Sequence, residues 1–338
     1  MTGFADDATF PFADRFEVLK RHGDFTLAYN AAAQPGLRYF RHGGGFLAFK
    51  TAGDVPFALG DPVADPGATG DLVRAFLSEW KSTGGGEPVF VQATDRTAGI
   101  LEAEGFFLND MGPDHRLDLP DYTFRGKDKE WLRYAANWCG RRDYQIREED
   151  PPAAELEAVT EAWRATRPSG TREVTFLNRP MVLEPEPGVR RFTLRAPAGE
   201  GGGLLAFFSF DPLYRDDAAV GYVTCLKRRR PEAPSLGEAA VMKRAIDAFQ
   251  AEGRQTLRLG LSPFADGKTR DYRENKLLAQ TFRLAFEANW VNRGFYALEN
   301  HSAYKRRFRG AEERTYFASR RWFNMKPLWR LAKLMGLI

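Results

Sequence analysis

The same order of strands and helix occurs twice along the chain, and this repeat limits the possible folds more than any other feature of the sequence. In the first half, hydrophobic periodicity predicts three strands, an amphipathic helix and a fourth strand, at residues 37–40, 46–50, 55–59, 69–83 and 88–93. In the second half, the same series is expected at residues 190–195, 204–210, 220–226, 235–251 and 256–261. Because the copies are long and far apart, we expect a duplicated α/β domain rather than a solenoid.

The length and composition agree with two domains. The chain has 338 residues, of which 43% are hydrophobic, enough for two cores. The helix at 235–251 opens with Ser235 and Glu238, a spacing that predicts a capping box. We expect an N-terminal domain, a linker containing a helix, a second domain and a basic tail, at residues 1–120, 121–150, 151–320 and 321–338.

Positive charge is concentrated near the C-terminus. Residues 301–338 sum to +8, and the other 300 residues sum to −4. A basic end on a slightly acidic body indicates a local anionic partner, phosphates of nucleic acid or lipid headgroups, rather than a protein that coats nucleic acid. Residues 328–335 place apolar side chains on one helical face with Trp329 beside it, which favours a helix lying on an anionic membrane through residues 320–338. Docking of this helix on the core of the chain or on a partner subunit is the alternative.

Several classes of protein are not indicated by the sequence. Cys139 and Cys225 lie far apart, and the four histidines have no ligand-like spacing, so we expect no metal and no disulfide. The chain has no P-loop, dinucleotide fingerprint or G-x-S-x-G elbow. Its N-terminus is acidic, and no apolar run approaches the ~20 residues that span a bilayer. We therefore expect a cytoplasmic protein.

Four short elements occur in one order in the second half of the chain. They are a G-K-x-x-x-x-L-R-x-x-x-N segment, the stretch from Cys225 to Arg228 followed by P-x-A-P, the hexapeptide L-G-L-S-P-F and the pentapeptide Y-K-R-R-F. Together they resemble the bacterial phosphatidylglycerol lysyl- and alanyltransferases, the aminoacyl-lipid synthases of the multiple peptide resistance factor type. The resemblance covers roughly residues 120–320 well and 35–120 weakly.

This resemblance implies a fold, an activity and a set of site residues. The fold is α/β (α+β), with two tandem GNAT-like domains, each a mixed, mostly antiparallel sheet flanked by helices. The activity is transfer of an aminoacyl group from charged tRNA to phosphatidylglycerol, a membrane lipid, at the inner face of the cell membrane and without a permanently bound cofactor. By resemblance the catalytic residues are Arg228, Lys305 and the residue at position 225, and the substrate-binding residues are Lys127, Arg133, Asn137, Gly260, Ser262 and Tyr304.

Cys225 departs from the family pattern, which has an aspartate three residues before its arginine. A carboxylate at this position could orient an amino group or accept a proton, so the identity of the donor depends on it. Cys225 itself is either a nucleophile beside cations or a small residue of the core.

Two other functions stay open. A thioester of coenzyme A or an acyl carrier could donate a fatty acyl group to a lipid amine, as when a sphingoid base becomes a ceramide. The chain could also be a non-catalytic module that binds tRNA or a membrane. No feature indicates a DNA partner.

Overall fold

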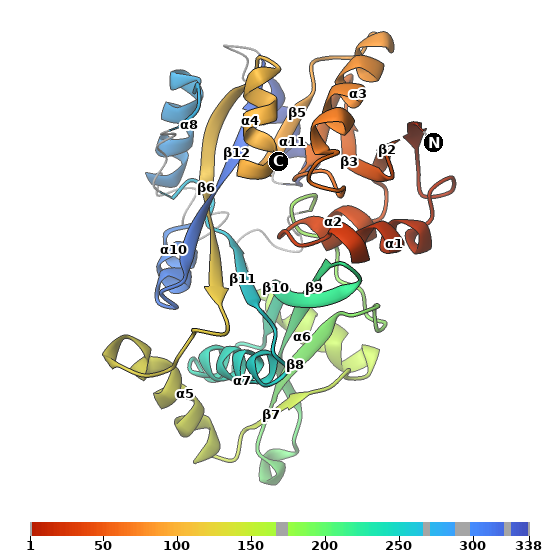
Figure 1. The fold of residues 1–338 in the computed structure, drawn as a ribbon. Helices are drawn as coiled ribbons and strands as arrows, with labels where there is room; N and C mark the ends of the chain where they lie inside the picture. The colour runs from red at the N-terminus through yellow and green to blue at the C-terminus, as the bar shows by residue number, and fades with distance from the viewer. Residues whose placement is uncertain (1, 167–174, 266–270, 288–297, 321–325, 337–338) are drawn as a thin grey trace.

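The computed structural model describes residues 2–166, 175–265, 271–287, 298–320 and 326–336. Its strands form one mixed sheet in the order β1-β2-β3-β4-β5-β12-β6-β11-β10-β9-β8-β7, with helices on both faces (Figure 1). The strands are β1 (Gly3–Ala5), β2 (Arg38–His42), β3 (Gly45–Ala52), β4 (Val55–Leu59), β5 (Val89–Thr94), β6 (Phe107–Asp118), β7 (Gln145–Glu148), β8 (Arg190–Arg195), β9 (Leu204–Arg215), β10 (Ala218–Arg229), β11 (Thr256–Leu261) and β12 (Ala311–Ser319).

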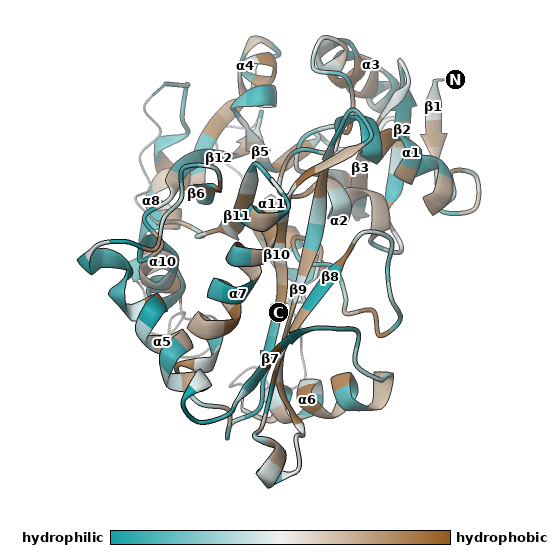
Figure 2. Ribbon diagram, turned by 60° about the horizontal axis from the view of Figure 1, so that its bottom comes forward, coloured by the Kyte–Doolittle hydropathy of each residue, from teal (hydrophilic) through white to brown (hydrophobic). Residues whose placement is uncertain are grey.

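Helices cover the two halves of the sheet separately. In the half that holds β2 to β5, α3 and α4 pack on one face, and α1, α2 and α11 pack on the other. In the half that holds β7 to β11, α5 and α7 pack on one face and α6 on the other. Both α5 and α7 carry hydrophobic and hydrophilic residues, as expected of helices with one buried face (Figure 2). The helices are α1 (Phe12–His22), α2 (Ala28–Ala33), α3 (Thr69–Ser82), α4 (Asp95–Ala103), α5 (Glu130–Gly140), α6 (Ala153–Ala165), α7 (Gly237–Ala251), α8 (Lys276–Glu287), α10 (Leu298–Arg306) and α11 (Lys326–Leu334).

The predicted repeat is confirmed. Strands β2, β3 and β4 pair antiparallel, α3 follows, and β5 returns parallel to β4. Strands β8, β9 and β10 likewise pair antiparallel, α7 follows, and β11 returns parallel to β10. The expected α/β fold with two tandem units of the same strand and helix order is therefore the observed one.

The last strand of each unit pairs with the other unit. Strand β6 follows the first unit but pairs with β11, whereas β12 follows the second unit but pairs with β5. Strands β6 and β12 also pair with each other along residues 107–116 and 311–319. The segment 151–320 expected for the second domain therefore contains a strand that lies inside the first half of the sheet.

Helix α7 begins differently from the prediction. It starts at Gly237, and the residue before it, Leu236, provides no side-chain cap. The carboxylate of Glu238 lies 2.5 Å from Nζ of Lys227 on β10, so it makes an ion pair instead of the capping-box hydrogen bond. The predicted capping box is therefore wrong, because a tertiary partner competes for the carboxylate.

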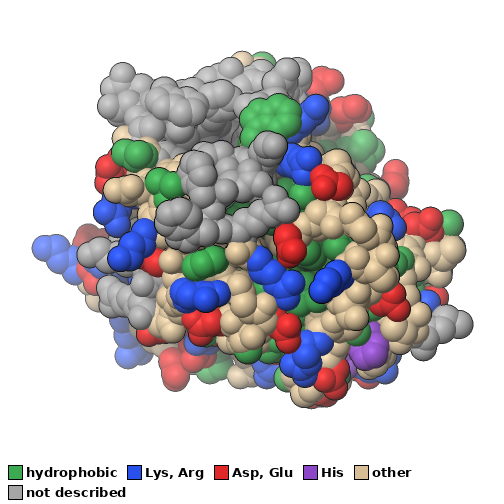
Figure 3. All heavy atoms as spheres, turned by 90° about the horizontal axis from the view of Figure 1, so that it is seen from above, with side chains coloured by type: hydrophobic (Ala, Val, Ile, Leu, Met, Phe, Trp, Pro, Cys, Tyr) green, Lys and Arg blue, Asp and Glu red, His purple; other side chains and the backbone are tan. Residues whose placement is uncertain are grey.

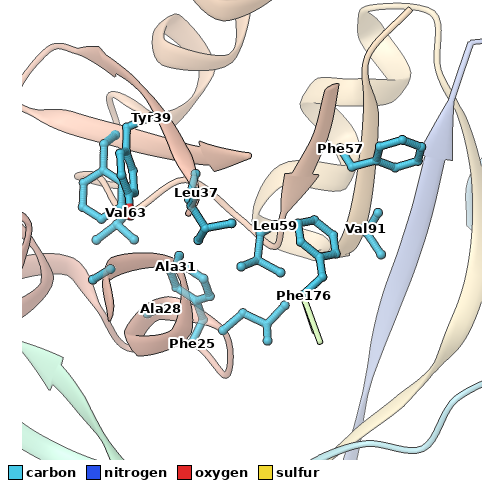
Figure 4. Packing of buried hydrophobic residues seen from close by; sticks show 14 of the residues in the cluster. Phe25, Ala28, Ala31, Leu37, Tyr39, Phe57, Leu59, Val63, Val91 and Phe176 are labelled. Carbon is cyan, nitrogen blue, oxygen red and sulfur yellow. The ribbon is translucent and has the colours of Figure 1, made fainter. Parts of the chain in front are cut away.

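Helix α11 docks on the core of the first half. Leu331 is buried in the same cluster as Phe176, a residue that points into the cluster next to Leu59 (Figure 4). The Arg330 guanidinium lies 2.7 Å from Asp54. The apolar face of α11 thus packs on the core of the chain, as the alternative to membrane binding predicted. Trp329 lies on the outer side of the helix and is 58% exposed. Residues 321–325 and 337–338 of the expected membrane segment lie outside the described part of the chain. None of the described helices is long and apolar enough to cross a membrane.

Among the residues that the structure describes, the C-terminal cations do not form one free basic surface. Five of them pair with acidic groups of the chain: Arg306 with Glu312, Arg309 with Asp128, Arg314 with Asp110, Arg320 with Glu87 and Glu104, and Arg330 with Asp54. Figure 3 shows the same mixing on the face seen from above, where blue and red side chains adjoin one another. Pairing of this kind lowers the potential that the sequence charge suggested.

Candidate functional site

The parallel strands β10 and β11 separate in the middle of the second unit. They pair from Gly221 to Val223 on β10, and this pairing ends where Val223 meets Arg258. Just beyond, a β-bulge in β10 adds Cys225 as an extra residue opposite β9. Thr224 and Cys225 are partly exposed, although the strand residues on either side are buried. The bulge therefore leaves Thr224 and Cys225 less buried than the strand residues beside them, at the position where the resemblance places a site.

Gly260 shapes the β11 side of this separation. Its φ of +80° is a left-handed conformation that favours glycine, and the register of β11 shifts there. A Cβ at Gly260 would lie 3.8 Å from Nζ of Lys305 on α10. Nζ of Lys305 donates a hydrogen bond to the carbonyl of Leu261 at 2.6 Å. The strand end and α10 are thereby joined through Lys305, one of the predicted catalytic residues.

Lys305 has a strongly perturbed amine. Burial and, to a smaller extent, the nearby Lys227 lower its pKa from 10.5 to about 7, and Asp114 opposes the shift. Lys227 lies on the face of β10 that is turned toward α10, with its Nζ 4.4 Å from the ring centre of Tyr304, the residue before Lys305. An amine with this pKa is neutral in a large fraction of molecules near pH 7, so it can accept a proton.

Arg228 lies on the opposite face of β10 from Lys227, as strand alternation requires. Its guanidinium carbon lies 3.6 Å from the ring centre of Trp163 on α6, and the residue is 7% exposed. This contact over the ring face helps to orient the guanidinium, and a planar fork of donors suits a phosphate. Arg228 and Lys305 thus approach the separation of β10 and β11 from its two faces.

Cys225 lies beside a carboxylate from the neighbouring strand. Its thiol hydrogen-bonds to Asp211 on β9, and burial together with that carboxylate raises the thiol pKa well above its usual value. A thiol with a raised pKa stays protonated at neutral pH, which disfavours the nucleophile interpretation. The missing aspartate at position 225 is therefore partly replaced by a carboxylate across the strand pair.

Asp211 belongs to a buried ion cluster. The guanidinium of Arg179 lies 2.7 Å from Asp211 and 2.6 Å from Glu186. Arg179 is 3% exposed at its side chain and Asp211 is 5% exposed. These three residues were not predicted from the sequence. The one signal that points to them is Asp211 itself, an acidic residue directly after the apolar run 204–210.

The G-K-x-x-x-x-L-R-x-x-x-N segment builds a separate pocket. Arg133 donates a hydrogen bond to the carbonyl of Gly126 at 2.9 Å, which holds the loop that begins the pocket. The pocket has a volume of about 500 Å³, and burial lowers the pKa of Lys129 at its wall to about 8. Asn137 is exposed on α5. The pocket is lined by residues 121–123 and 125–129 and by Arg309, and so includes Lys127.

Ser262 is fully buried after β11. Its hydroxyl lies 2.9 Å from Nε2 of His115 on β6, and the backbone N–H of Ser262 donates to the carbonyl of Pro113. Because Ser262 is 0% exposed, its contacts tie the end of β11 to β6. Of the predicted residues, Gly260, Tyr304 and Lys305 lie close together, and Ser262 is buried next to the end of β11. The other three, Lys127, Arg133 and Asn137, lie on α5 or in the segment before it.

Comparisons with known proteins identify a family whose model matches most of the chain. Residues 16–319 match the family model described as "Phosphatidylglycerol lysyltransferase, C-terminal". The phosphatidylglycerol lysyltransferase of Bacillus subtilis is 23% identical over 274 residues, which are 79% of this chain and 29% of that protein. The one from Staphylococcus aureus MRSA252 is 25% identical over 178 residues, 51% of this chain and 20% of that protein. The chain thus spans less than a third of the length of these relatives.

Two solved structures share the fold. The structure of L-PGS from Bacillus licheniformis has a TM-score of 0.78 at 20% identity and covers 96% of this chain and 97% of that chain. The C-terminal domain of a putative lysylphosphatidylglycerol synthetase from Agrobacterium fabrum has a TM-score of 0.75 at 18% identity, covering 96% and 95%.

Proposed function

Because the chain belongs to the family of the phosphatidylglycerol lysyltransferase C-terminal domain, we propose that it is an acyltransferase that moves an aminoacyl group from charged tRNA to the glycerol hydroxyl of phosphatidylglycerol. The observation that carries this proposal is Lys305, an amine with a pKa of about 7 that lies where β10 and β11 separate. Acyl transfer to a hydroxyl needs a proton acceptor of this strength near neutral pH.

The reaction exchanges one ester for another. The oxygen of the glycerol hydroxyl attacks the carbonyl carbon of the donor ester, and a new C–O bond forms. The C–O bond to the tRNA ribose breaks. The proton of the glycerol hydroxyl passes to the neutral amine of Lys305, and from there to the departing ribose oxygen. Neither a redox step nor a metal is required by this balance.

Arg228 supplies the second part of the proposed site. A guanidinium that stacks on Trp163 at 3.6 Å is held in one plane and can bind two phosphate oxygens at once. We assign it to the phosphate of the lipid acceptor, on the face of β10 opposite Lys305. The proposal places the reaction at the inner surface of the cell membrane, with charged tRNA as donor and without a resident cofactor.

A transfer assay with separated components tests the proposal. The purified chain is mixed with aminoacyl-tRNA carrying a radioactive amino acid and with vesicles that contain phosphatidylglycerol, and lipid products are identified by mass spectrometry. We expect labelled aminoacyl-phosphatidylglycerol from the wild type and at least about 100-fold less from Lys305→Met. A parallel arm offers acyl-coenzyme A and a sphingoid base. Product in that arm alone would replace the proposal by lipid N-acylation, and no product in either arm would refute transfer by this chain.

A further inference from the structure

The charges around Cys225 limit how many positively charged groups the aminoacyl donor can bring to the site. An aminoacyl donor with an uncharged side chain brings one ammonium group, its α-amino group, whereas a lysyl donor brings two. Each ammonium needs a carboxylate or other negative partner if it is to leave water. The number of carboxylates at the β10 bulge that the chain does not already use therefore decides between the two classes of donor.

Arg179 already uses most of the negative charge at this position. It forms a two-point hydrogen-bonded pair with Asp211, Nε to Oδ2 at 3.2 Å and Nη2 to Oδ1 at 2.7 Å. Its remaining nitrogen, Nη1, contacts both oxygens of Glu186, at 2.7 and 2.6 Å. Two carboxylates thus surround one guanidinium, and the surplus of this cluster is one negative charge.

Neighbouring acidic groups among the described residues are also paired within the chain. Glu238 pairs with Lys227 on the other face of β10. Asp114 and Glu313 both pair with Arg258 on β11, and Glu313 also pairs with Arg116, so this group has no surplus charge. These ion pairs leave the Arg179 cluster as the source of negative charge at the bulge, where Cys225 is partly exposed and hydrogen-bonds to Asp211.

We propose that Arg179 is a specificity-determining residue that occupies the position of a donor's side-chain cation, so that this protein accepts aminoacyl groups with uncharged side chains, such as alanyl, and rejects lysyl. The single surplus charge of the Arg179, Asp211 and Glu186 cluster pairs with the α-amino group of the donor. A carboxylate in place of Cys225 would raise the surplus to two and accommodate a second ammonium. This inference rests on the proposed aminoacyl transfer.

A comparison of two donors, each assayed alone, tests this inference. The purified chain is given alanyl-tRNA and lysyl-tRNA separately, with phosphatidylglycerol vesicles, and kcat/KM is measured for each. We expect a preference for alanyl of about tenfold or more, which corresponds to about 1.4 kcal/mol or more. In Cys225→Asp the preference is expected to shift toward lysyl by a similar factor, and the matched neutral variant Cys225→Asn should keep the wild-type preference.

Variants of Arg179 separate specificity from stability. Arg179→Lys keeps the cation and should keep the alanyl preference. Arg179→Met combined with Glu186→Gln removes one charge of each sign, which avoids leaving two buried carboxylates unpaired. That double variant should also keep the preference, because its surplus is unchanged, whereas Arg179→Met alone should gain lysyl transfer. A purely structural Arg179 would lower transfer from both donors equally in all three variants and leave the ratio unchanged.

The outcomes distinguish this inference from the proposed function. Transfer from lysyl-tRNA as fast as from alanyl-tRNA by the wild type would overturn the inference and leave aminoacyl transfer standing. A ratio unchanged in Cys225→Asp would overturn it as well. Absence of transfer from both donors would refute the proposed function, and the inference with it.

Discussion

Replacing Lys305 by methionine should raise the stability of the fold while it removes the proposed activity. Burial lowers the pKa of this amine from 10.5 to about 7, so at pH 7 the folded state disfavours the protonation that the unfolded chain would adopt. With 1.36 kcal/mol for each pKa unit, the cost at pH 7 is about 4 kcal/mol. Loss of the hydrogen bond to Leu261 returns about 1 kcal/mol, so we expect Lys305→Met to be more stable by roughly 2–3 kcal/mol.

The sign of the pH dependence follows from the same shift. Between pH 7 and 10.5 the unfolded chain binds more protons at Lys305 than the folded chain, so the free energy of unfolding rises with pH in this window. The Lys305→Met variant lacks this contribution. Urea denaturation followed by circular dichroism at pH 7, 8 and 9 measures both curves, and their difference should narrow as the pH rises.

The transfer activity should also depend on the protonation of Lys305. If neutral Lys305 accepts the proton, kcat/KM should fall about tenfold per pH unit below 7 and level off above it. Lys227→Met removes a neighbouring positive charge and should move the midpoint to higher pH. The reasoning is refuted if Lys305→Met is less stable than the wild type at pH 7, or if the midpoint stays the same in Lys227→Met.

Four further changes have expected outcomes. Gly112→Ala places a methyl group against the carbonyl that follows β11 at a φ of +113°, and should cost about 3 kcal/mol or more in thermal unfolding; an unchanged Tm contradicts this. Arg228→Lys loses the guanidinium contact over the Trp163 ring and should raise KM for the lipid about tenfold without changing stability. Arg258→Met leaves the buried Asp114 without its ion-pair partner, while Glu313 keeps Arg116, and should cost about 3–5 kcal/mol in urea denaturation. Trp329→Ala should weaken binding to anionic vesicles, and salt should weaken binding by the wild type; insensitivity to both excludes α11 from the membrane contact.

Local patterns predicted the repeating unit well. Alternating apolar residues and a following amphipathic helix are properties of short segments, and the helices predicted at 69–83 and 235–251 appear at Thr69–Ser82 and Gly237–Ala251. The exchange of β6 and β12 was not predicted, because it depends on which strands pair across some 200 residues. A strand at 311–319 has the same local pattern whichever neighbours it has.

Sequence reasoning found the site residues that lie in short motifs but missed those that only the tertiary structure brings together. Lys305 and Gly260 lie in short motifs, and the structure brings them together: a Cβ atom built on Gly260 would lie 3.8 Å from Nζ of Lys305. Arg179 and Asp211 lie in no motif, and their partnership depends on the path of the chain between α6 and β8. The resemblance drew attention to Cys225, but the carboxylate that faces it comes from β9 and could not be assigned without the sheet register.

The position of β12 also orders events during synthesis. The strand fits between β5 and β6, so the first half of the sheet has a vacant place until residues 311–319 have left the ribosome. Until then, strands β5 and β6 expose unpaired backbone edges, and such edges are sites of aggregation. A nascent chain stopped before residue 311 should therefore need a chaperone, and adding the 311–319 segment as a peptide should restore the missing pairing.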